Sequence, residues 1–94
     1  MNLDDIRVKI DEIDTQILDL FCRRMDLVKG VAAYKIENDM PVLRPEREKL
    51  ILERVRADAG EEYGDYAVKL FETAMAVSRD MQTEMIRQKQ RQEK

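Results

Sequence analysis

The chain has 94 residues, of which 17 are basic and 20 acidic, so its net charge is -3. This length predicts one small domain, and the near-balanced charge excludes a protein whose whole surface attracts nucleic acid or an anionic membrane. Histidine is absent and Cys22 is the only cysteine, which excludes Ser-His and Cys-His catalysis and argues against a zinc site.

The three glycines are isolated and form no phosphate-binding loop. We therefore expect no metal, nucleotide or other cofactor. No apolar run approaches the roughly 20 residues that span a bilayer, and a lone cysteine fits a reducing compartment. The sequence thus favours a cytoplasmic protein.

The stretch from residue 3 to about residue 37 predicts one long amphipathic helix, because it lacks proline and its apolar residues recur at steps of three and four. These residues are Leu3, Ile6, Ile10, Ile13, Ile17, Leu20, Leu27, Val31 and Tyr34. At about 1.5 Å per residue the helix is roughly 50 Å long, whereas a compact domain of this length is only roughly 30 Å across. Its ends therefore need cover from outside a monomer's core, and a second copy of the chain can supply it.

Two further helices are predicted, over residues 45–59 and 65–88. Pro45 suits the first turn of a helix, Gly60 is a C-terminal stop signal, and the acidic residues 61–64 form a short link. A polar tail follows the last helix. Together these elements predict an all-α, three-helix chain without a sheet.

Several polar residues interrupt the apolar faces of these helices. Arg24 occupies a position where the periodic pattern of the first helix predicts an apolar residue, and Lys35 lies on the same face three turns later. On the other two helices the inward polar residues are Arg47, Glu48, Ser78 and Gln82. Taken singly, each has a structural explanation, such as a register-setting arginine or a lysine that snorkels to water. Together they predict a cationic pocket with one carboxylate, suited to a small dianion that carries a hydroxyl.

Arg7 also lies beside the apolar seam of the first helix. It precedes Arg24 by 17 residues, a separation of roughly 25 Å along one helix, so the two cannot serve the same pocket from one chain. In an antiparallel dimer, the start of one long helix lies beside the later half of its partner. Arg7 would then enter the partner's pocket.

The chain closely resembles the small all-helical class of chorismate mutases. The residues that carry the resemblance extend over nearly the whole sequence: Arg7, Ile10, Ile13, Asp14, Leu20, Arg24, Tyr34, Lys35, Pro41, Arg47, Glu48, Ser78 and Gln82. The resemblance implies an intertwined homodimer with two active sites, each completed by an arginine of the other subunit. It also implies the rearrangement of chorismate to prephenate, toward phenylalanine and tyrosine, without a cofactor.

The resemblance further implies a role for each polar residue on the carboxylate side of the substrate. Arg24 and the partner's Arg7 would bind the two carboxylates, for which the guanidinium fork is well suited. Arg47 and Ser78 would support that side of the site.

At the ether and hydroxyl side, the resemblance implies that Lys35 and Gln82 point at the oxygen of the breaking bond. Glu48 would accept a hydrogen bond from the ring hydroxyl, assisted by the backbone at position 44. The family often has an acidic residue where this chain has Arg44, so this position is where the chain departs from the family pattern.

Three other functions remain open from the sequence. On the same fold, an isochorismate pyruvate lyase or an aminodeoxychorismate mutase would use a similar cationic pocket. A helical dimer without catalytic activity, such as an adaptor, would instead use the apolar seam itself. The Arg24→Leu substitution separates this last class from the enzymes. It makes the apolar stripe continuous, which an adaptor would tolerate, but it removes a cation of the pocket, which an enzyme needs for activity.

Overall fold

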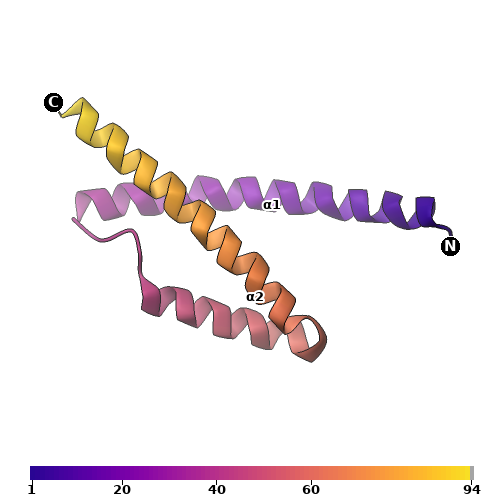
Figure 1. Ribbon diagram of the computed structural model, residues 1–94. Helices are drawn as coiled ribbons and strands as arrows, with labels where there is room; N and C mark the ends of the chain where they lie inside the picture. Colours follow the sequence, from indigo (N-terminus) through magenta and orange to yellow (C-terminus); the bar gives the residue numbers. More distant parts are fainter. Residues whose placement is uncertain (94) are drawn as a thin grey trace.

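The computed structural model describes residues 1–93, and all regular structure within them is helical. Helix α1 spans Leu3–Glu37 and helix α2 spans Pro45–Gln92. The all-α prediction is therefore confirmed for the described residues. Two helices are counted where three were predicted, because α2 continues across a kink at Gly60 and so contains both of the later predicted helices. Figure 1 shows that α2 reverses direction part of the way along and that its later part crosses α1.

The reversal within α2 takes place at Gly60. Its φ of 84° and ψ of 178° are not helical, and they lie in a region of the backbone map that is essentially restricted to glycine. The residues on both sides are helical, so residues 61–64 belong to a helix instead of forming the predicted link. We refer to residues 45–59 as the first arm of α2 and to residues 61–92 as its second arm.

The two arms approach closely just after the reversal. A Cβ atom on Gly64 would lie 3.2 Å from both the Cγ atom and the carbonyl oxygen of Arg56. Arg56 also forms an ion pair with Asp65, which links the end of the first arm to the start of the second. The polar residues from Arg87 onward, predicted as a tail, extend the second arm as far as Gln92.

Local capping signals define the two ends of α1. The side chain of Asn2 accepts a hydrogen bond from the backbone N–H of Asp5 at 2.9 Å, which satisfies one of the free donors of the first turn. At the other end, Asp39 adopts a positive φ of 55°, and the N–H of Met40 donates to the carbonyl of Lys35. An irregular segment then leads to Pro45, the first residue of α2.

One chain alone buries very little apolar surface. Among the described residues, the buried apolar side chains are Ala32, Val55, Val68 and Met75. Every residue from 1 to 23 is exposed, and the N-terminal end of α1 projects beyond α2 (Figure 1). The radius of gyration is 17.0 Å, against about 12 Å for a compact chain of this length. The apolar stripe of α1 is therefore uncovered along much of its length.

The apolar residues of this stripe do not make α1 a membrane helix. Within the described part of the chain, neither helix is long and apolar enough to cross a bilayer.

Candidate active site

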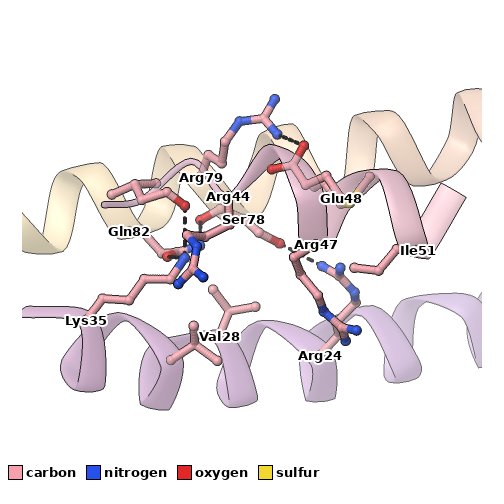
Figure 2. A pocket seen from close by; sticks show the side chains of 13 residues that line it. Arg24, Val28, Lys35, Arg44, Arg47, Glu48, Ile51, Ser78, Arg79 and Gln82 are labelled. Atoms are coloured by element: carbon pink, nitrogen blue, oxygen red, sulfur yellow. Dashed lines mark hydrogen bonds and ion pairs between the residues drawn. The ribbon is translucent and has the colours of Figure 1, made fainter. Parts of the chain in front are cut away.

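A cavity of about 390 Å³ lies between α1 and the two arms of α2, and Figure 2 shows its lining side chains. Its polar lining consists of Arg24, Lys35, Arg44, Arg47, Glu48, Ser78, Arg79 and Gln82. Its apolar lining consists of Val28, Val31, Val42, Ile51 and Met75. Five lining side chains are arginine or lysine and one is glutamate, so the cavity favours an anionic ligand that keeps one hydroxyl or other donor for the carboxylate.

Arg24 reaches the cavity from the middle of α1, where the helix first comes under cover of α2. Its Nη1 donates to the hydroxyl of Ser78 at 2.6 Å. Ser78 is itself buried and donates to the carbonyl of Ala74 at 2.9 Å, one turn earlier in the second arm. The hydroxyl thus fixes one N–H of the guanidinium, and the remaining donors are available to bind a carboxylate.

Lys35 enters the cavity from the last turn of α1. Its Nζ donates to the carbonyl of Val42 at 2.8 Å and to the side-chain oxygen of Gln82 at 2.9 Å. Gln82 is only 5% exposed, and its amide nitrogen donates to the carbonyl of Ser78 at 3.3 Å. An ammonium group has three donors, so one remains for a ligand between Lys35 and Gln82.

Partial burial and a neighbouring charge change the proton affinity of Lys35. Its pKa is lowered from the ordinary value of 10.5, first because burial disfavours the ammonium and second because of the positive charge of Arg44. The carboxylate of Glu48 acts in the opposite direction. Lys35 is therefore electrostatically coupled to both charged side chains at this end of the cavity.

Glu48 lies in the first turn of α2 and forms an ion pair with Arg79 of the second arm. Nη1 of Arg79 donates to Oε1 of Glu48, and the dashed line in Figure 2 marks this contact. Sequence reasoning missed Arg79. A signal for it exists, because Arg79 follows the buried Met75 by four residues and precedes Gln82 by three, which is the spacing of one helix face.

Arg44 and Arg47 complete the cationic lining. Arg44 is the residue before the first turn of α2, and Arg47 lies within that turn. In Figure 2 the side chain of Arg44 reaches toward Lys35 and that of Arg47 toward Arg24. Within residues 1–93, neither arginine forms an ion pair, so both keep their charge for a ligand.

The structure therefore brings together seven of the eight residues that the sequence singled out, namely Arg24, Lys35, Arg44, Arg47, Glu48, Ser78 and Gln82. Arg7 does not line the cavity of its own chain, because it lies in the exposed N-terminal part of α1. Among the residues that the structure describes, no group of three or more carboxylate or cysteine side chains is arranged to hold a metal ion.

Comparison with known proteins connects this cavity to a family. The family model described as "Chorismate mutase type II" matches residues 6–83, which include all eight predicted site residues. A chorismate mutase of Methanocaldococcus jannaschii is 36% identical over 94 residues, covering 98% of this chain and 95% of the relative. The match therefore extends over nearly the whole of both proteins.

Longer proteins match over part of the chain. The T-protein of Haemophilus influenzae is 37% identical over 57 residues, which are 61% of this chain and 15% of that protein. A bifunctional chorismate mutase/prephenate dehydratase of Buchnera aphidicola is 41% identical over 49 residues, or 52% of this chain and 13% of the relative. No solved structure gave a significant match. On the family match and the full-length relative, the chain belongs to the chorismate mutase type II family.

Proposed function

We propose that the protein is an isomerase that rearranges chorismate to prephenate in the biosynthesis of phenylalanine and tyrosine. The observation that carries this proposal is the convergence of Arg24, Lys35, Glu48 and Gln82 on one cationic cavity, in a chain of the chorismate mutase type II family. The lone cysteine fits a reducing compartment, and we place the activity in the cytoplasm.

The reaction is a unimolecular 3,3-sigmatropic rearrangement. The ether C–O bond breaks while a new C–C bond forms, and no proton, electron or leaving group enters or leaves the substrate. The protein therefore needs to supply geometry and charge, which a site without a nucleophile or an imidazole can do. Holding a flexible enolpyruvyl ether in its chair-like reactive conformer contributes on the order of 7 kcal/mol in favourable intramolecular cases.

The cations of the cavity hold the substrate in that conformer. Arg24 binds one carboxylate with the N–H groups that Ser78 leaves available, and Arg47 supports it from the first arm. Glu48 accepts a hydrogen bond from the ring hydroxyl. The two ends of the substrate are thereby fixed on opposite sides of the cavity.

Lys35 and Gln82 act on the bond that breaks. Negative charge develops on the ether oxygen as the C–O bond lengthens, and the ammonium and amide N–H groups stabilise it. Because Lys35 is already bonded to Gln82 and Val42, its donor is oriented before the substrate reacts. Electrostatic stabilisation by preorganised donors of this kind is usually the largest single contribution to an enzyme's rate enhancement.

We propose further that the working enzyme is a homodimer in which Arg7 of one chain enters the cavity of the other. Three observations support this proposal. The residues from 1 to 23 are exposed in the single chain, the chain is far more extended than a compact domain, and Arg7, to which the resemblance assigns a substrate carboxylate, lies outside the cavity of its own chain. An antiparallel second copy covers the stripe of α1 and supplies that arginine.

The identity of the products tests the proposed reaction. The purified protein is incubated separately with chorismate and with isochorismate, and the products are identified. Prephenate from chorismate, without pyruvate from either compound, is the expected result. Salicylate and pyruvate from isochorismate would instead identify a lyase, and no turnover of either would favour an adaptor.

A pair of neighbouring arginines provides the control for this assay. Arg24→Ala should abolish prephenate formation. Arg23→Ala should not, because the Arg23 side chain is 70% exposed and, within residues 1–93, its ion-pair partner is Asp19 on the same helix surface.

A further inference from the structure

The ion pair between Arg79 and Glu48 differs from the other ion pairs of the described chain. Its two side chains are 32% and 23% exposed, whereas in every other pair both side chains are at least 49% exposed. It also joins the two arms of α2 across 31 positions of sequence. The pair therefore lies at the cavity wall and joins a side chain of the first arm to a side chain of the second arm.

Glu48 has competing partners within the same cavity. Arg44 and Arg47 line it as well and have no ion pair among residues 1–93. A glutamate has three side-chain torsions and is free to turn toward either of them. If it did, the carboxylate would neutralise a cation that the substrate needs, and the acceptor would leave the place where the ring hydroxyl binds.

We propose that Arg79 is a positioning residue that acts through Glu48. By donating to Oε1, it keeps the carboxylate away from Arg44 and Arg47 and leaves the second carboxylate oxygen to accept the hydroxyl of the substrate. This inference rests on the proposed role of Glu48 in hydroxyl binding. Arg79 itself does not contact the substrate.

A double-mutant cycle measures this coupling. The variants are Arg79→Met, which keeps the aliphatic stem without the charge, Glu48→Gln, and the two combined. Arg79→Met should lower kcat/KM for chorismate about tenfold, as expected for losing a charged hydrogen bond. In the Glu48→Gln background the same change should have little further effect, because the group through which it acts is already altered.

Two further measurements separate a positioning role from a purely structural one. Arg79→Lys restores a charge and should recover part of the loss. An analogue of chorismate without the ring hydroxyl is measured as a substrate or as a competitive inhibitor. Its kcat/KM or inhibition constant should be the same for the wild type and for Arg79→Met. Arg87→Met is the matched control, because Arg87 lies on the same helix with its side chain 68% exposed. Thermal unfolding checks that each variant is folded, and if Arg79→Met is not, the cycle is run with Arg79→Lys.

The outcomes distinguish this inference from the proposal on which it rests. If Glu48→Gln has full activity on chorismate, the substrate hydroxyl does not need the carboxylate of Glu48, and the inference fails with it. If Glu48→Gln is impaired while Arg79→Met is as active as wild type, or while the two losses multiply independently, only the role of Arg79 is wrong. A loss with the hydroxyl-free analogue equal to that with chorismate would show that Arg79 contacts another part of the substrate.

Discussion

Replacing Lys35 by alanine removes the only lysine among the residues that line the cavity. Its ammonium already bonds to Val42 and Gln82 at 2.8 and 2.9 Å, so its third donor is held in place without further ordering. Loss of one such preorganised donor to a developing oxyanion costs about 2.7 to 4 kcal/mol, a factor of about 100 to 1,000 in kcat. We expect a fall of this size for Lys35→Ala, measured from the rate of chorismate consumption at saturating substrate.

The comparison variant is Ser78→Ala in the same cavity. The hydroxyl of Ser78 orients Arg24 through one hydrogen bond, and losing a single bond that acts indirectly costs about 1 kcal/mol, or roughly fivefold. Thermal unfolding of both variants shows whether either has lost its fold. Equal losses of less than about tenfold in both variants would refute the role of Lys35 at the ether oxygen.

Three further predictions concern the charge of the cavity and the fold of α2. Arg24→Leu should lower kcat/KM about a hundredfold or more. Its Tm should be unchanged or raised, because leucine completes the apolar stripe. Retained turnover would contradict the assignment of this cavity as the active site. Because Lys35 acts as a cation, kcat falls as the pH rises through its pKa. Arg44→Gln removes a positive charge that lowers this pKa, so the alkaline limb of the pH profile should move to higher pH, and an unmoved limb would show that another group causes it. Gly60→Ala should lower the free energy of unfolding by about 1 to 3 kcal/mol, whereas Gly30→Ala inside α1, where a Cβ meets nothing within 4 Å, should raise it by up to about 1 kcal/mol. Denaturant unfolding compares the two, and equal effects would contradict the strain assigned to Gly60.

The all-helical class could be predicted because the period of three and four residues is strong and proline is absent from it. The prediction of a link at residues 61–64 was wrong, because these residues are helical. The glycines at positions 60 and 64, at both ends of an acidic stretch, suggest a loop. In the structure Gly60 alone makes the reversal, and a Cβ atom at Gly64 would lie tightly against Arg56, at 3.2 Å. Periodicity along one helix carries no information about such contacts between arms.

The polar lining of the cavity could be predicted in large part because charged residues stand out on apolar helix faces. Arg24 and Lys35 interrupt a regular stripe, and their partners Ser78 and Gln82 do the same on the second arm. Arg79 was missed because an arginine next to Ser78 suggests a solvated surface, and only the folded chain brings it to Glu48. The contribution proposed for Arg7 depends on a second copy of the chain, which the geometry of one chain does not contain.

Complementation between two inactive variants tests most directly the claim that two chains form each active site. Arg7→Ala and Arg24→Ala proteins are each assayed with chorismate and then mixed under conditions that exchange subunits. With random exchange half of the dimers are mixed and each carries one intact site, so about a quarter of the wild-type activity should return. A mixture as inactive as its components, although exchange has taken place, would contradict a site shared between two chains.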